Sequence, residues 1–288
     1  MTRLVALFLL ILLATSVQAT DRPVIVASTT STQNSGLLDE ILPIFTDKTG
    51  IEVRVVAVGT GQALRIARNG DADVLLVHHR PSEDAFVAEG YGVERRDVMY
   101  NDFVLVGPAS DPVGIAGAAT AAEALARIAA ARAAFLSRGD DSGTHKKELE
   151  LWADAGLAPA DPDWYRQAGA GMGTTLNIAV AMEAYVLTDR GTWITFGNKG
   201  GHKILMAGDP ALYNPYGVVV VSPDRFPHVN ASGATALADW LVSDQGQAAI
   251  GAFRIQGQQA FCPNSQATAE QRDKDRKACP VDDQSRDG

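Results

Sequence analysis

The segment 137–152 reads Ser-Arg-Gly-Asp-Asp-Ser-Gly-Thr-His-Lys-Lys-Glu-Leu-Glu-Leu-Trp. The apolar run before it is typical of a short buried strand, and Leu149 and Trp152 fit one face of a helix that begins near Thr144. A strand, a Gly/Ser/Thr loop and a helix together direct backbone N–H groups and the positive end of the helix dipole at one point. Arg138 adds a full charge there. The segment therefore predicts an anion site or, in the simpler interpretation, an ordinary capped helix.

The same combination of loop and helix start recurs three more times. A strand is expected over 24–27 before the hydroxyl run at 28–32, and another over 51–58 before the Gly-Thr-Gly at 59–61. The Gly-Met-Gly-Thr-Thr run at 171–175 opens a fourth helix, without a clear strand before it. Four such helix starts in one chain favour a shared anion clamp over four separate caps.

Strands that alternate with helices predict an α/β fold. Gly107-Pro108 indicates a crossover to a second domain, and an apolar strand over 217–221 indicates the return. A further strand is expected over 192–196. Two opposed lobes, each a sheet flanked by helices, would bring the four helix starts to one cleft. The expected bounds are 20–107 with 214–261 for lobe I, and 108–213 for lobe II.

Adjacent histidines, His78 and His79, follow a strand expected over 74–77. Neighbouring residues of a strand point to opposite faces, so the pair does not readily chelate one metal ion. Both are interpreted as packing or surface residues.

Composition limits the class of protein and its partners. Hydrophobic residues make up 46% and charged residues 20% of the 288-residue chain, as in globular proteins. The net charge of −9 argues against nucleic acid or an anionic membrane as a partner. Residues 1–19 have the pattern of a cleaved secretion signal, with Arg3, an apolar core and the small-residue site Val17-Gln18-Ala19. The mature protein is therefore expected to be exported.

The two cysteines, Cys262 and Cys279, both lie near the C-terminus. In an oxidising compartment they are expected to form a disulfide within a C-terminal tail over 262–288. A metal site built from both cysteines and a histidine is the alternative.

Several runs of the sequence, in the same order, resemble the periplasmic tungstate-binding proteins of ABC importers. These runs are Ser-Thr-Thr-Ser-Thr-Gln-Asn-Ser-Gly-Leu-Leu-Asp at 28–39, Val-Gly-Thr-Gly-Gln-Ala-Leu at 58–64, Gly-Asp-Ala-Asp-Val-Leu-Leu-Val-His at 70–78, Met-Tyr-Asn-Asp-Phe-Val-Leu-Val-Gly-Pro at 99–108 and Ser-Arg-Gly-Asp-Asp-Ser-Gly-Thr-His at 137–145. The resemblance spans roughly residues 24–265 and leaves out the cysteine tail. Ser28 stands where the family usually has threonine, which keeps the hydroxyl.

The resemblance implies a two-lobed type II periplasmic binding fold, a tetrahedral oxyanion ligand such as tungstate or molybdate, and permease and ATPase subunits as membrane partners. It implies a periplasmic, monomeric carrier that needs no metal and no cofactor. Residue by residue, it places Thr29, Thr30, Thr60, Arg138 and Thr144 on the anion. The helix starts add Gly61, Ser142 and Thr174 to the candidate set.

Two alternatives remain. The same fold could bind sulfate or phosphate. A site of donors alone disfavours protonated phosphate, so the loop acids Asp140 and Asp141 are expected to cap or pair rather than face the ion. A serine hydrolase using Ser142 or Ser31 is more remote, because the chain has no Gly-x-Ser-x-Gly elbow and only His145 lies near as a base.

Overall fold

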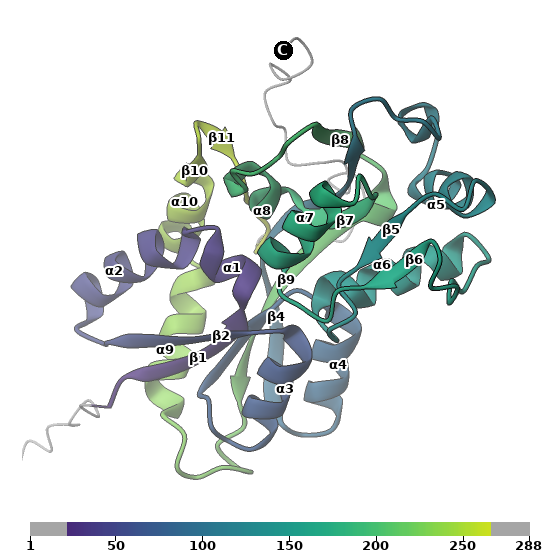
Figure 1. The fold of residues 1–288 in the computed structure, drawn as a ribbon. Helices are drawn as coiled ribbons and strands as arrows, with labels where there is room; N and C mark the ends of the chain where they lie inside the picture. Colours follow the sequence, from purple (N-terminus) through teal and green to yellow (C-terminus); the bar gives the residue numbers. More distant parts are fainter. Residues whose placement is uncertain (1–21, 266–288) are drawn as a thin grey trace, which may run out of the picture.

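Two β-sheets share one long strand, β4 (Gly92–Pro108), in the computed structural model of the protein, which describes residues 22–265 (Figure 1). The first half of β4 pairs antiparallel with β9 (Tyr213–Val221). From Phe103 onward β4 pairs instead with β7 (Val186–Asp189) and β8 (His202–Met206). Each sheet forms the centre of one lobe, so the α/β two-lobed fold predicted from the sequence is confirmed.

The sheet of lobe I has the strand order β12-β4-β9-β3-β1-β2. In it β1 pairs parallel with both β2 and β3, while β9 is antiparallel to β3 and β4. The remaining elements of the lobe are β1 (Val24–Thr29), α1 (Thr30–Asn34), α2 (Leu37–Thr49), β2 (Val53–Val58), α3 (Thr60–Arg68), β3 (Val74–Val77), α4 (Arg80–Ala88), α9 (Ala231–Val242), α10 (Asp244–Ala252), the hairpin β10 (Arg254–Ile255) and β11 (Gln258–Gln259), and β12 (Cys262–Pro263).

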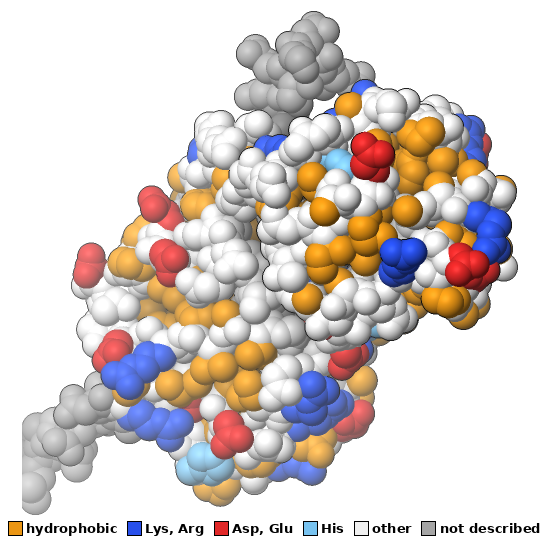
Figure 2. Space-filling model, in the orientation of Figure 1, with side chains coloured by type: hydrophobic (Ala, Val, Ile, Leu, Met, Phe, Trp, Pro, Cys, Tyr) orange, Lys and Arg blue, Asp and Glu red, His pale blue; other side chains and the backbone are white. Residues whose placement is uncertain are grey.

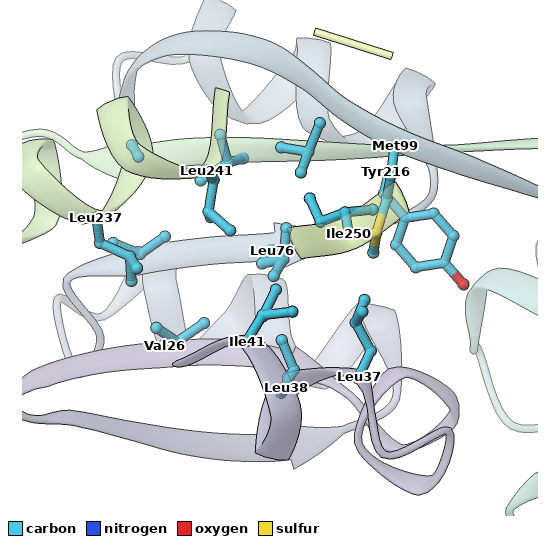
Figure 3. Close-up of a cluster of buried hydrophobic side chains, with 14 of the residues drawn as sticks. Val26, Leu37, Leu38, Ile41, Leu76, Met99, Tyr216, Leu237, Leu241 and Ile250 are labelled. Carbon is cyan, nitrogen blue, oxygen red and sulfur yellow. The ribbon is translucent and has the colours of Figure 1, made fainter. Parts of the chain in front are cut away.

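Helices cover both faces of this sheet with separate apolar clusters. On one face Leu38 and Ile41 of α2 belong to the same cluster as Leu237 and Leu241 of α9 (Figure 3). On the other face Leu64 of α3 and the rest of its cluster pack against the sheet together with α4. Apolar strands buried on both faces, as β3 is, are typical of a parallel sheet between two helix layers.

Lobe II is built around the second half of β4. Phe103 and Leu105 join the cluster under α5 (Ala121–Ala130) and α6 (Gly143–Asp154), whereas Val104 and Val106 join the one under α7 (Met172–Ala181). The parallel pair β5 (Phe135–Ser137) and β6 (Tyr165–Gln167) is attached through a bridge between Phe135 and Tyr185. The lobe is completed by α8 (Arg190–Thr195) and the 3₁₀ turns η1 (Ile115–Gly117) and η2 (Pro210–Leu212).

The chain passes between the lobes on two neighbouring strands. β4 changes its pairing partners between Asp102 and Phe103, and Asp102 lies opposite Tyr213, where β9 begins. The sequence predicts the crossover at Gly107-Pro108. β4 continues as one strand through both sheets, so its change of partners lies earlier, inside the strand. These two adjacent strands, here called the hinge, carry the chain from one lobe to the other.

The strand predicted over 192–196 is wrong, because α8 occupies most of that segment. Asp189 caps this helix by accepting hydrogen bonds from the backbone N of Thr192 at 2.9 Å and from its hydroxyl at 2.6 Å. A buried N-cap thus overrides the strand preference of the β-branched and aromatic residues. The sequence also gave no sign of β6 before α7.

Some expectations concern segments outside the described residues. The signal peptide over 1–19 lies there, and so does Cys279, so the disulfide to Cys262 stays a prediction. Cys262 itself is buried in β12, opposite Tyr100 of β4. Within residues 22–265, the helices are too short or too polar for any of them to span a bilayer.

Candidate anion site between the lobes

The loop between β5 and α6 carries most of the predicted site. Ser142 caps α6 by accepting a hydrogen bond from the backbone N of His145 at 3.2 Å. Asp141 has a positive φ of 58°, which turns the chain into the helix. The ring of His145 is tied to the backbone of the same loop, because its Nδ1 accepts from the N of Asp141 at 3.2 Å. Among the described residues, Ser142 and His145 therefore do not form the hydroxyl–imidazole pair that a hydrolase needs.

The start of α6 in lobe II lies against the start of α3 in lobe I. The backbone N of Gly143 donates to the hydroxyl oxygen of Thr60 at 3.0 Å, and the N of Gly61 donates to the carbonyl of Asp141 at 3.3 Å. A Cβ on Gly61 would lie 1.9 Å from the Asp141 carboxylate, and one on Gly143 would lie 2.7 Å from the ring of His78. Position 143 therefore requires glycine, because the buried ring of His78 leaves no room for a side chain, whereas at position 61 the exposed carboxylate of Asp141 could move aside.

Arg138 is the buried cation of the loop, with 3% of its surface exposed. Its Nη2 donates to Asp140 at 2.5 Å and its Nε donates to the carbonyl of Ala170, just before α7, at 3.3 Å. These two bonds use two of the five N–H donors of a guanidinium. On the face seen in Figure 2 acidic and basic side chains are scattered over both lobes and form no continuous basic patch. Arg138 is therefore an enclosed charge and not part of an exposed basic patch.

Thr144 offers a buried hydroxyl that nothing satisfies. Its side chain is 1% exposed, and its Oγ1 has no hydrogen-bond partner within the described part of the chain. A buried hydroxyl at a helix start that is not used by the protein's own groups is a donor that can meet an anion there.

The hydroxyl run of α1 is arranged differently from the α6 loop. Thr29 is buried and caps α1, with its Oγ1 3.3 Å from the N of Thr32 and 2.7 Å from the Thr32 hydroxyl. Thr30, the first residue of the helix, is half-buried. Hydroxyls that bond one another can still each turn a hydrogen toward a ligand.

Thr174 is not brought into the buried cluster. Its side chain is exposed on α7, whereas the neighbouring Thr175 is buried and donates to the carbonyls of Ala170 and Gly171. The start of α7 nevertheless lies beside the site, because Ala170 accepts the hydrogen bond from Arg138.

Both loop carboxylates are engaged by cations or amides. Asp140 accepts from Arg138 and, through its other oxygen, from the N of Ser142 at 3.2 Å. Asp141 contacts Lys146 at 2.7 Å and Arg65 at 3.5 Å, and the hydrogen bond from Lys146 is the main cause that lowers the pKa of Asp141. Both acids therefore pair or cap as expected, and their orientation away from a bound anion stays a prediction.

His78 was interpreted as a packing or surface residue, and it lies buried at the centre of the interlobe contact. Its Nδ1 lies 2.9 Å from Oδ1 of Asn214, and its ring stacks on Tyr216 at 4.9 Å. Asn214 in turn donates to Oδ1 of Asn101 at 2.6 Å, which leaves its own Oδ1 to accept from His78. Burial lowers the pKa of His78 to about 4, so the ring is neutral near pH 7.

Asn101 and Asn214 also belong to this polar group, although no sequence motif points to them. They face one another across β4 and β9 at the hinge, and both are 1% exposed. The sequence offers little signal for them, because β4 also carries charged residues and Asn101 does not stand out among them. The three polar residues link the hinge to the start of α6.

Other features of the surface do not coincide with this site. A cavity of about 620 Å³ lies between α8, β8 and the β10–β11 hairpin, and it is lined by Trp193, Lys199 and Lys203 among others. None of the predicted site residues lines it. Within residues 22–265, no three His, Cys, Asp or Glu side chains are grouped so that they could hold a metal ion.

Comparison with known proteins gives the class. Residues 14–245 match the family described as a PBP superfamily domain. The chain is 49% identical over 246 residues to the tungstate-binding protein TupA of Peptoclostridium acidaminophilum, covering 84% of this chain and 86% of that protein.

Two solved structures are similar along most of the chain. The tungstate ABC transporter structure from Geobacter sulfurreducens has a TM-score of 0.75 and 51% identity, covering 81% of this chain and 99% of that one. The tungstate-binding protein TupA from Desulfovibrio alaskensis G20 has a TM-score of 0.73 and 46% identity, covering 85% of this chain and 100% of that one. Fold and interlobe site together define a substrate-binding protein of the PBP superfamily. Within that superfamily, the chain belongs to the TupA family of ABC-transporter tungstate-binding proteins.

A buried acid on α6 lies next to the β5–α6 loop and makes the stability of the protein depend on pH. Glu148 is 2% exposed and accepts from the hydroxyl of Tyr165 at 2.8 Å and from the indole N–H of Trp152 at 3.3 Å. Burial raises the pKa of Glu148 from its ordinary 4.5 to about 7, and hydrogen bonds from Ser137 and from the backbone of Arg138 oppose the shift.

The folded protein therefore binds the Glu148 proton more tightly than the unfolded chain does. The stability that this provides is fully present below the unfolded pKa and is lost as pH rises through about 7. The side chain of Glu148→Gln cannot ionise. As pH rises from about 5 to about 8, the unfolding free energy of this variant should therefore increase relative to that of wild type by up to ~3 kcal/mol. Urea unfolding at both pH values measures this. Glu94→Gln, at an exposed position of β4, is the control, and its difference in unfolding free energy from wild type should be the same at both pH values. The same constancy for Glu148→Gln would contradict the assignment.

Proposed function

We propose that this protein captures tungstate between its lobes and delivers it to the membrane permease and ATPase subunits of an ABC importer. The observation that carries the proposal is the enclosed Arg138, which lies in the same loop as the unpartnered hydroxyl of Thr144 and against two helix starts. The similarity to TupA proteins names the ion. The secretion signal expected over 1–19 supports a periplasmic, exported carrier.

The ligand set of the proposal follows the chemistry of the site. Arg138 supplies the formal charge, and the hydroxyls of Thr60, Ser142 and Thr144 lie at the starts of α3 and α6 with their backbone amides. Thr29 and Thr30 would complete the shell from α1. Gly61 would contribute its backbone N–H by exchanging the 3.3 Å hydrogen bond to the carbonyl of Asp141 for one to the anion. Thr174 can contribute through the backbone start of α7 but not through its exposed hydroxyl. Binding in this form needs no metal and no cofactor.

The strength of such a site is adequate for a scavenging carrier. Hydrogen bonds to a charged group contribute roughly 1.5–3 kcal/mol each. A nanomolar site needs about 12 kcal/mol net. Several donors together with a desolvated guanidinium can supply this after the ordering of the lobes is subtracted. Molybdate has the same charge and nearly the same shape, so the proposal includes it as a second ligand.

Removing the buried charge is the first test. Arg138→Ala should weaken tungstate binding by roughly 2–5 kcal/mol, about 30-fold to several thousand-fold, because the dianion loses its desolvated partner. Thr144→Val keeps the shape of the side chain and should cost about tenfold or more. Isothermal titration calorimetry measures both.

Two variants serve as controls. Arg54→Ala removes an exposed cation that pairs only within lobe I, with Glu52, and Thr174→Val removes the exposed hydroxyl of α7. Both should bind tungstate within about threefold of wild type. If Arg138→Ala behaves like these controls, Arg138 is not in the site.

The choice among anions is the second test. Phosphate keeps a proton near neutral pH and needs an acceptor, whereas Asp140 and Asp141 already pair with Arg138, Lys146 and Arg65. Tungstate and molybdate should therefore bind at least about 100-fold more tightly than phosphate, roughly 2.8 kcal/mol. Sulfate should bind weakly because a cavity sized for the larger ion leaves it short of donors. Phosphate that displaces tungstate at similar concentrations in a competition assay would contradict this donor-only site.

A further inference from the structure

A second contact joins the lobes farther along α6, between two residues that the proposed ligand set does not use. Nε2 of His79, in lobe I, lies 3.1 Å from Oε1 of Glu150, in lobe II. The side chains are 13% and 41% exposed, so the pair lies at the rim of the interlobe contact.

The hydrogen bonds around His79 fix its tautomer. The backbone N of Ser82 donates to Nδ1 of His79 at 3.3 Å, and the Ser82 hydroxyl lies 2.6 Å from the same nitrogen. A backbone N–H can only donate, so Nδ1 accepts and Nε2 carries the proton. Nε2 of His79 therefore donates to the carboxylate of Glu150.

The lobe I end of this contact is rigid. The backbone N of His79 donates to Oε1 of Glu83 at 2.7 Å, and Glu83 is fully buried and bound by Nε of Arg95 at 2.6 Å. His79 is also the N-cap of α4. Little conformational entropy is therefore lost when His79 meets its partner.

The lobe II end is carried by the same helix as the anion loop. Gly143 and Glu150 are two turns apart on α6 and lie on similar sides of it, at a separation of about 10 Å along its axis. The same helix thus touches lobe I at its first residue, through Thr60, and again at Glu150. Because the lobes are joined through the hinge strands, opening the cleft must separate His79 from Glu150.

We infer that the hydrogen bond between His79 and Glu150 is a latch that favours the closed lobes and slows release of the bound anion. The inference rests on the proposed function and adds to it two positioning residues that do not touch the ligand. A latch of this kind acts mainly on the dissociation rate, because it holds the lobes together once they have closed, with or without an ion between them.

The test is a double-mutant cycle on the full chain. Glu150→Ala should speed the release of radiolabelled tungstate into unlabelled tungstate about three- to tenfold, as expected for a partly exposed charged hydrogen bond. Lys147→Ala is the matched control, because Lys147 binds the other oxygen of Glu150 at 2.9 Å from within the same helix. That variant should release tungstate within about twofold of wild type.

His79→Ala also removes a helix cap, so its own effect on release is not interpreted. The cycle instead compares the effect of Glu150→Ala in the wild-type chain with its effect in the His79→Ala chain. If the latch exists, Glu150→Ala has no further effect on release in the His79→Ala background. An equal effect in both backgrounds, or no effect of Glu150→Ala in the wild-type chain, overturns the inference.

The failure of the ligand assignment gives a different result. A wild-type protein that retains no labelled tungstate contradicts the proposed function alone. The latch is then tested by small-angle scattering of the ligand-free chains, in which Glu150→Ala should have the larger radius of gyration. Equal radii for wild type and variant overturn the latch.

Discussion

The close approach of two helix starts from different lobes is the contact on which the site depends. At the starts of α3 and α6 backbone N–H groups carry partial positive charge, and the buried guanidinium of Arg138 adds a full one. The carboxylate of Asp140 offsets part of this charge, and the buried Asp189 also interacts electrostatically with Arg138. Glycine at position 143 allows the approach, and Thr60 fixes its distance through its hydroxyl. An enclosed place rich in donors and poor in acceptors favours an anion that carries no proton.

The hinge connects this place to the rest of the fold. One continuous strand, β4, serves both sheets, and its neighbour β9 carries the chain back. Asn101 and Asn214 face one another on these strands and reach the loop through His78. A neutral, hydrogen-bonded imidazole there adds no charge, so the electrostatic balance of the cleft is left to Arg138 and its carboxylate. Closure of the lobes thus assembles a site whose parts are each held by their own lobe.

The parts of the fold and the site that could be predicted from the sequence are those encoded in a few adjacent residues. The α/β class and the hydroxyl-rich starts of α1, α3 and α6 were visible because caps and turns are written in a few adjacent residues. Thr174 and Thr175 show the limit, since neighbouring helix residues point about 100° apart and the sequence does not fix which one faces inward. Asn101 and Asn214 were missed because strand register joins residues far apart in the chain. Asp189 could have revealed α8 as an N-cap, but the β-branched residues after it favoured a strand.

The most direct measurement is tungsten anomalous diffraction from crystals of the protein grown with tungstate. The central claim, that Arg138 and Thr144 hold the anion between the starts of α3 and α6, predicts one strong tungsten peak within hydrogen-bonding reach of both side chains. A peak in the cavity beside Trp193 and Lys199, or peaks only on the outer surface, would contradict it.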